Sequence, residues 1–139
     1  MMIQYRSILA LSAVLVVPFG YSTRFSSLLP EWFRNVAGNI AYETLLILLL
    51  LLVFPKVKPI AAAITVCLIS FGLEFLQLSQ NPILVAARSN FLGRLILGSS
   101  FDWGDFPLYV LGSLIGWVYA ARVKRSVYGQ ASAKSADLR

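Results

Sequence analysis

The chain has 139 residues, of which 58% are hydrophobic and 13% are charged, with a formal net charge of +6 and a mean hydropathy of +0.76. A soluble domain has about 25% charged residues, so this composition indicates a membrane protein with room for one domain. The absence of histidine and the single cysteine, Cys67, exclude histidine-based catalysis, histidine metal sites and a disulfide framework within the chain. Basic residues in such a chain set its orientation and contact anionic lipid headgroups, so nucleic acid is not an expected partner.

Four apolar segments predict an all-α fold, a four-helix transmembrane bundle that forms a single domain over residues 1–125. They comprise residues 7–22, 37–54, 59–80 and 104–121. A membrane-spanning helix needs about 20 residues, so the first segment is slightly short, and Pro18 predicts a kink in it. Arg6 before this segment would also suit a signal peptide, but no A-x-A-like cleavage site follows, which favours an uncleaved first helix.

Two further segments flank the last apolar helix. Residues 83–97 are mostly apolar and predict an extra short helix, which is too short to span the bilayer. We expect it to be interfacial or half-inserted on the outer side; an extended loop is the alternative. Residues 126–139 are small and polar, which predicts a flexible cytoplasmic tail.

The basic residues predict how the chain is oriented in the membrane. Eight of them lie on the side of the two termini and of the connection between the second and third helices, and four lie on the opposite side. The four are Arg24, Arg34, Arg88 and Arg94. Because the side with more Lys and Arg usually faces the cytoplasm, we expect a multi-pass protein with both termini cytoplasmic.

Polar residues gather near the predicted outer ends of the helices. Glu43 follows the start of the second helix by about six residues and Glu74 precedes the end of the third by about six, so both should lie roughly 9 Å below the outer boundary. Steps of three and four residues place Gln77 on the same helix face as Glu74, and Tyr109 on the same face as Asp105. If these faces meet, they enclose a polar pocket that Arg88 and Arg94 of the outer segment would close.

The predicted ligand-binding residues combine carboxylates, an amide, a phenol and two guanidinium groups: Glu43, Glu74, Gln77, Arg88, Arg94, Asp105 and Tyr109. Ionisable residues inside a membrane normally face the bundle interior and pair. Two interpretations therefore stay open, a ligand or transport site and a structural staple in which Glu74 or Asp105 pairs with Arg88. No catalytic residue, metal ligand or cofactor is predicted. Gly112 and Gly116 form a small-xxx-small pattern, which favours close packing within the bundle over dimerisation.

Several of these stretches resemble a known family. They are "RFSSLLPEW", "GNIAYE", "GLEFLQL", "AARSNFLGRLILG" and "FDWGDFPLYVLGSLIG". They resemble the small bacterial membrane proteins of the domain-of-unknown-function 2809 family, and more distantly they are similar to the VanZ-like family. The resemblance places the family's polar signature on five of the residues above and its glycines on Gly93, Gly98 and Gly112. Asn39 stands where an acid is common in the family, so either Glu43 supplies that charge or this chain lacks one acidic function.

The resemblance also implies a cellular location and a general role for the protein. VanZ-like proteins are associated with resistance to glycopeptide antibiotics, which act on cell-wall precursors outside the membrane. By analogy the chain is expected in a bacterial inner (cytoplasmic) membrane, with a role at the cell envelope.

The predicted function is the binding of a lipid or lipid-linked cell-envelope headgroup in the outward-facing pocket, with arginine contacting phosphate. The alternative is a structural or assembly role with another membrane protein or in a homo-oligomer. Transport of a proton or small solute is less well supported, because the helices are almost purely apolar below the carboxylates. An enzymatic role is disfavoured, because arginines accompany the acids and no nucleophile stands out. Membrane lipids are the expected partners.

Overall fold

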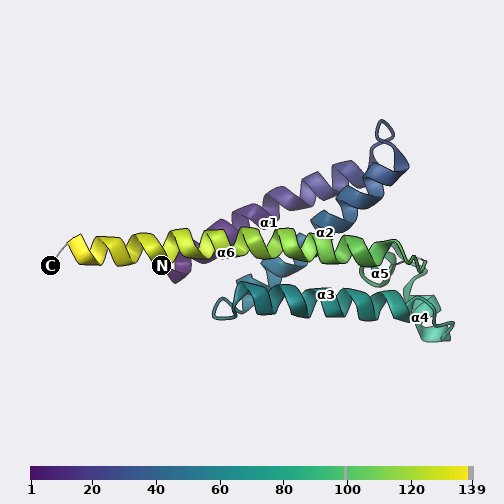
Figure 1. Ribbon diagram of the computed structural model, residues 1–139. Helices are drawn as coiled ribbons and strands as arrows, with labels where there is room; N and C mark the ends of the chain where they lie inside the picture. The colour runs from purple at the N-terminus through teal and green to yellow at the C-terminus, as the bar shows by residue number, and fades with distance from the viewer. Residues whose placement is uncertain (99, 138–139) are drawn as a thin grey trace.

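The computed structural model describes the backbone of residues 1–98 and 100–137 and the side chains of residues 1–98 and 100–130. In this part of the chain six helices follow one another (Figure 1): α1 (Met2–Phe25), α2 (Glu31–Val53), α3 (Pro59–Leu76), α4 (Pro82–Ala87), α5 (Phe91–Leu97) and α6 (Asp105–Asp137). Four of them are long and apolar enough to cross a membrane: α1, α2, α3 and residues Asp105–Gln130 of α6. The predicted all-α membrane protein with four spanning helices is therefore confirmed.

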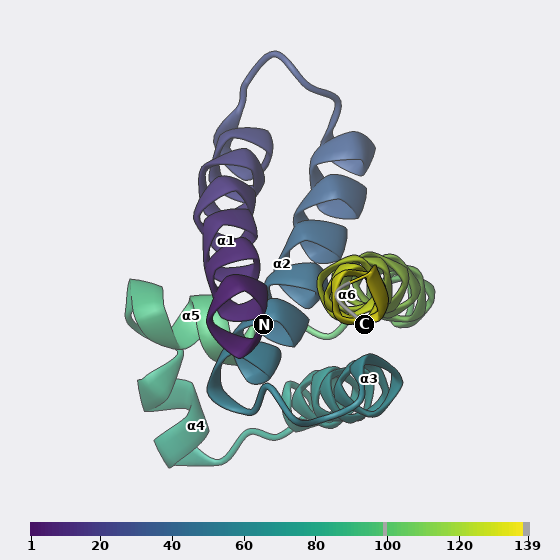
Figure 2. The same ribbon diagram turned by 90° about the vertical axis from the view of Figure 1, so that its left-hand side faces the viewer.

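The four long helices run up and down between two ends of the molecule (Figure 1). The N-terminus, residues 54–58 and the C-terminal end of α6 lie at one end, which we call the terminal end. Residues 26–30, α4, α5 and the start of α6 lie at the other, which we call the pocket end. Helix α2 is central because it packs against α1, α3 and α6, while α6 also packs against α3 (Figure 2).

The apolar core fills the terminal half of the bundle. Its fully buried side chains come from α1, α2, α3 and α6, and they include Tyr5, Leu9, Ile47, Leu48 and Leu51. Most other large apolar side chains are exposed on the outside of the helices, as expected for surfaces that face lipid. The buried polar side chains of the described residues are Thr23, Glu43, Ser70, Glu74 and Ser113, and all five lie on the pocket-end side of the apolar core.

The helix bounds differ from the predicted segments at several ends. Helix α1 has 24 residues and is therefore about 36 Å long, which exceeds the roughly 30 Å hydrocarbon core of a bilayer, so the first span is not short. Helix α6 continues through most of the predicted tail, residues 126–139, as far as Asp137; residues 138–139 lie outside the described chain. The extra helix predicted over residues 83–97 is instead two short helices, α4 and α5, separated by Arg88–Asn90.

Each of these two short helices begins with its own asparagine cap. The Asn81 side chain accepts a hydrogen bond from the backbone N–H of Ile83, and the Asn90 side chain accepts one from Gly93. Asparagine is a strong N-cap residue because its side-chain oxygen satisfies a free N–H of the first turn. A Cβ on Gly93 would lie 1.6 Å from the carbonyl oxygen of Ala87, so only glycine lets α5 approach α4 this closely. The second cap and this close contact explain why one apolar segment forms two helices.

Candidate functional site

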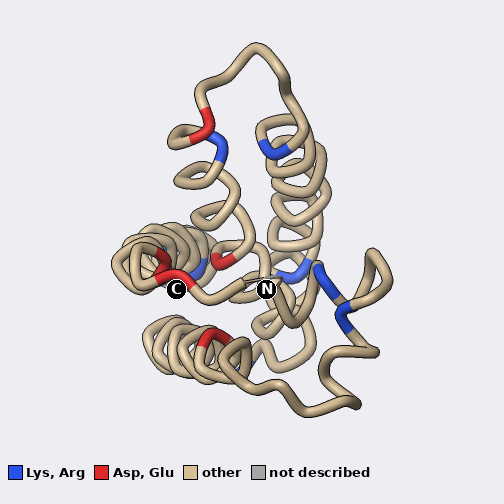
Figure 3. The backbone as a smooth tube through the Cα atoms, turned by 90° about the vertical axis from the view of Figure 1, so that its right-hand side faces the viewer, with Lys and Arg blue, Asp and Glu red and all other residues tan. Residues whose placement is uncertain are grey.

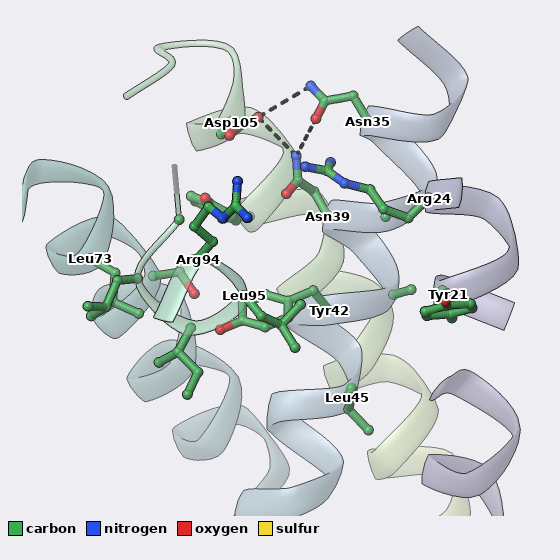
Figure 4. A pocket seen from close by; sticks show the side chains of 18 of the residues that line it. Tyr21, Arg24, Asn35, Asn39, Tyr42, Leu45, Leu73, Arg94, Leu95 and Asp105 are labelled. Carbon is green, nitrogen blue, oxygen red and sulfur yellow. Dashed lines mark hydrogen bonds between the residues drawn. The ribbon is translucent and has the colours of Figure 1, made fainter. Parts of the chain in front are cut away.

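A cavity of about 460 Å³ opens at the pocket end, and we call it the main cavity. Residues of α1, α2, α3, α5, the 98–104 connection and the first turns of α6 line it (Figure 4). Its lining is polar toward the pocket end, where Asn35, Asn39 and Asp105 lie, and apolar toward the bundle interior, where Val16 and Leu45 lie. A cavity with these two zones suits a ligand that has a polar head and an apolar part.

Two arginines point into the main cavity from opposite sides, Arg24 from the last turn of α1 and Arg94 from α5 (Figure 4). Both side chains are exposed. Among the described residues, neither guanidinium group donates a hydrogen bond or lies in an ion pair, whereas that of Arg88 donates three. Guanidinium groups bind phosphate and carboxylate in a bidentate geometry, so these two side chains are available for an anionic group.

Asp105 begins α6 and faces two amides of α2. Its Oδ1 atom accepts hydrogen bonds from the Nδ2 atoms of Asn39, at 2.9 Å, and of Asn35, at 3.4 Å (Figure 4). Asn39 also donates to the side-chain oxygen of Asn35 at 3.3 Å. An acid in place of Asn39 would repel Asp105, whereas the amide donates to it. This contact gives a physical reason for an amide at position 39.

Glu74 of α3 is completely buried, and three donors surround its carboxylate. Its Oε2 atom accepts from the Tyr109 hydroxyl at 2.8 Å and from Gln77 Nε2 at 2.9 Å, and its Oε1 atom accepts from the backbone N–H of Asp102 at 2.7 Å. Glu74 does not itself line the main cavity, although Gln77, Asp102 and Tyr109 do. It therefore connects α3, the 98–104 connection and α6 from behind the cavity wall.

Glu43 of α2 is also completely buried, at the junction of three helices. Its two carboxylate oxygens accept one hydrogen bond each, from Ser70 of α3 at 2.7 Å and from Ser113 of α6 at 2.8 Å. Like Glu74, it is absent from the cavity lining, whereas Ser70 belongs to it. Neither predicted carboxylate therefore lines the main cavity. A ligand there would contact their hydrogen-bond partners instead.

Arg88 occupies a different place from the predicted one. Its guanidinium group donates to the backbone carbonyls of Leu76 at 2.6 Å, Ser79 at 3.4 Å and Gln77 at 3.5 Å. They belong to the last residue of α3 and to two residues just beyond it, where backbone acceptors lack partners within the helix. Arg88 pairs with neither Glu74 nor Asp105 among the described residues, and it does not line the main cavity. It stabilises the end of α3, and the structure places it neither in the main cavity nor in a bond to either carboxylate.

Acidic and basic positions both lie at the pocket end (Figure 3). Acidic positions lie on α2, on α3 and around the start of α6, and basic positions lie at the end of α1, at the start of α2 and on α4 and α5 with their connection. The described residues contain no group of three acidic or cysteine side chains that are close enough together to hold a metal ion. The acids of the site accept hydrogen bonds from neutral donors, and Arg24 and Arg94 are left without a partner among the described residues.

The predicted glycines lie where helices or loops approach closely. Added Cβ atoms on Gly112 and Gly116 would each lie 2.7 Å from a side chain of α2, that of Glu43 or of Ile47. Gly98 has a φ of 73°, in the left-handed region that favours glycine, and its Cβ would lie 2.3 Å from Gln77 Nε2. Because these glycines have no Cβ, α6 can pack closely against α2, and Gly98 can lie close to the Gln77 side chain.

Several residues of the site were missed by the sequence prediction. Arg24 is the most important, because it is one of the two free guanidinium groups of the main cavity. Asn35 was also missed, although it lies one turn before Asn39 on the same helix face, a spacing that the sequence contains. Arg24 has no such signal, because it comes from a helix that the predicted pocket did not include.

Comparisons with known proteins came to one family. The model of the family described as "Protein of unknown function (DUF2809)" matches residues 28–113, which is more than half of the chain. The comparison with curated proteins and the comparison with solved structures each gave no match. The more distant similarity to VanZ-like proteins is not among these findings and stays a prediction. The chain belongs to the DUF2809 family of proteins of unknown function.

Proposed function

We propose that the main cavity binds the headgroup of a lipid or of a lipid-linked cell-envelope molecule, with Arg24 and Arg94 on its phosphate. The observation that carries this proposal is the pair of arginines, which point into one cavity and have no partner among the described residues. An anionic group between them would make charge-assisted hydrogen bonds to both guanidinium groups.

The apolar side of the main cavity favours a lipid over a free anion. Val16 and Val17 of α1, Leu45 of α2 and Leu73 of α3 line it below the polar zone. On α1, Val17 lies seven residues before Arg24, a distance of about 10 Å along the helix. If the arginines hold the headgroup, the start of the apolar chain of the lipid would lie against these side chains. This contact removes apolar surface from water, which is favourable.

Transport is less well supported by the arrangement of the core. Below the buried carboxylates, toward the terminal end, the packed side chains shared by α1, α2, α3 and α6 are apolar, among them Ile47, Leu51 and Val66. A transport path needs polar groups near the middle of the bilayer and an exit on the far side. The polar groups described here concentrate in the half toward the pocket end, which suits binding from that side.

Lipid analysis of purified protein tests this proposal. Wild type and the variants Arg94→Gln and Arg24→Gln are purified in a mild detergent, and their retained lipids are identified by mass spectrometry. Arg125→Gln is the matched control, because it removes the same charge from an exposed position at the terminal end. We expect a distinct phosphate-bearing lipid in wild type and in the control, reduced about tenfold or more when either cavity arginine is changed, since a hydrogen-bonded charge contact is worth about 1.5–3 kcal/mol.

The same bulk lipid in all four proteins would contradict headgroup binding. It would favour the alternative, an assembly role with another membrane protein, which cross-linking in membranes then tests. The orientation of the cavity toward the outside, the bacterial inner membrane and the cytoplasmic termini are parts of the same proposal. They rest on the distribution of basic residues and on the family resemblance.

A further inference from the structure

On one side of the main cavity, side chains at α3 and at the start of α6 present hydrogen-bond acceptors, whereas the two arginines present donors. We infer that the ligand is a phosphate ester whose alcohol part itself carries hydrogen-bond donors, hydroxyl or amino groups. This inference rests on the proposed function and narrows its ligand class. It follows from the hydrogen bonds that four polar side chains of this wall already make within the protein.

Two acceptors of the wall have no partner among the described residues. Gln77 donates through Nε2 to the buried Glu74, which fixes its amide, and its Oε1 atom is buried without a hydrogen bond. Asp105 accepts both asparagine amides on Oδ1, and no described hydrogen bond reaches its Oδ2 atom. Both side chains line the main cavity. A buried acceptor without a donor costs free energy, and a ligand that supplies the donor removes that cost.

Two hydroxyl groups of the wall also present only hydrogen-bond acceptors to the main cavity. Tyr109 donates its hydrogen to Glu74, and Ser70 donates its hydrogen to Glu43. A hydroxyl group has one hydrogen and two lone pairs, so each of these groups retains acceptor capacity only. The two buried glutamates therefore act as positioning residues, because they turn both hydroxyl hydrogens away from the main cavity. Four wall groups, on α3, at its C-cap and on α6, thus offer a free acceptor, and of these four only the Gln77 amide keeps a second hydrogen.

The complementary ligand carries its negative charge and its donors at different atoms. Phosphate oxygens would face Arg24 and Arg94, and hydroxyl or ammonium hydrogens would face Gln77, Asp105 and the two hydroxyl oxygens. A phosphate ester capped by methyl or trimethylammonium groups satisfies the arginines but leaves the acceptors unpaired. Sites built to hydrogen-bond a ligand hydroxyl or amine discriminate strongly against analogues that lack it, since the site's own polar groups are then left without partners.

Two matched pairs of lipids with identical dioleoyl chains separate charge from donors. Phosphatidylglycerol and phosphatidylmethanol are both anionic, and only the first has free hydroxyl groups. Phosphatidylethanolamine and phosphatidylcholine are both zwitterionic, and only the first has ammonium hydrogens. Native mass spectrometry of the full chain in detergent, with each pair added in equal amounts, measures the ratio of the two bound lipids. We expect the donor-bearing lipid to be favoured about tenfold in at least one pair, the effect of about 1.4 kcal/mol.

The variant Asp105→Asn checks the cause of such a preference. The asparagine keeps an oxygen for the two α2 amides but replaces the free acceptor with an amide donor, so the ratio should fall toward one. The pair that shows the preference identifies the donor as hydroxyl or amine. Equal binding within both pairs by wild type would overturn the inference. If Arg94→Gln then still weakened binding of all four lipids, the proposed headgroup binding would stand without the inference about donor groups. Lipid binding that does not depend on Arg94 would contradict both the inference and the proposed function.

Discussion

Replacement of Gly112 by alanine should weaken the contact between α6 and α2. The added Cβ would lie 2.7 Å from the Cβ of Glu43 and 3.2 Å from the Cα of Ile40. Nonbonded carbon atoms pack best at about 3.5–4.0 Å, and neither of these two neighbours can rotate away because both are fixed to the α2 backbone. The two helices must therefore separate by roughly 1 Å, which also strains the Ser113–Glu43 hydrogen bond.

Gly72→Ala provides the matched control for this substitution. Gly72 lies inside α3 on an exposed face, and an added Cβ there meets no atom within 4 Å. Both substitutions gain up to about 1 kcal/mol of helix propensity, so this gain cancels when the two variants are compared. Overpacking of a filled interior typically costs about 1–3 kcal/mol. We expect the free energy of unfolding of Gly112→Ala to be lower than that of Gly72→Ala by this amount.

Unfolding in mixed micelles measures this difference. Each variant is titrated from a mild detergent into sodium dodecyl sulfate, and loss of tertiary structure is followed by tryptophan fluorescence. Equal midpoints for Gly112→Ala and Gly72→Ala would refute the close α2–α6 contact. A changed oligomeric state of Gly112→Ala, with unchanged unfolding of the monomer, would instead make the glycine pair a dimer contact.

Three further predictions concern the buried polar groups and the orientation. Arg88→Ala should lower the free energy of unfolding by about 1.5–3 kcal/mol, because charged hydrogen bonds to the end of α3 are lost. The lipids retained by the folded protein should stay unchanged. Loss of a lipid with unchanged stability would instead show that Arg88 contacts the ligand of the main cavity. Glu43→Leu should cost about 1–3 kcal/mol for each serine hydroxyl left without its acceptor, and additional replacement of both serine donors by alanine should recover most of that loss in the same micelle titration. No recovery would show that the serines do not depend on the glutamate. Reporter fusions after Lys58 should be active in the cytoplasm and fusions after Ser100 outside it, and the reverse pattern would place the main cavity on the cytoplasmic side.

Part of this architecture follows from local features of the sequence. The bilayer requires every backbone N–H and C=O to be satisfied within a segment, so long apolar runs must be helices and their number can be counted. Helix periodicity placed Gln77 beside Glu74 on one face, and the structure has their side chains hydrogen-bonded. The short connection at residues 54–58 also made α2 and α3 neighbours, which the contacts of these helices bear out.

The local signals were weaker where two structures compete for one segment. Residues 83–97 have a single apolar pattern, but the Asn90 cap starts a second helix within it. Helix α3 ends at Leu76, before the predicted end at residue 80, and Arg88 donates to the carbonyl of Leu76 and to two carbonyls beyond it. At both places a polar side chain satisfies backbone groups at a helix boundary, and hydrophobicity does not report such contacts.

Composition and the lengths of the apolar segments are enough to predict the class of the protein, its four spanning helices and buried acids near one end. Which partner each charged group meets depends on how the helices pack. The helix partners of Glu74 and Glu43 come from α3 and α6, and their identity depends on how each helix is rotated about its own axis. Arg88 and Arg94 lie in the same apolar segment, yet one caps a helix and the other enters the main cavity. A long arginine side chain can reach several neighbours, so its role is set by the packing around it and not by its place in the sequence.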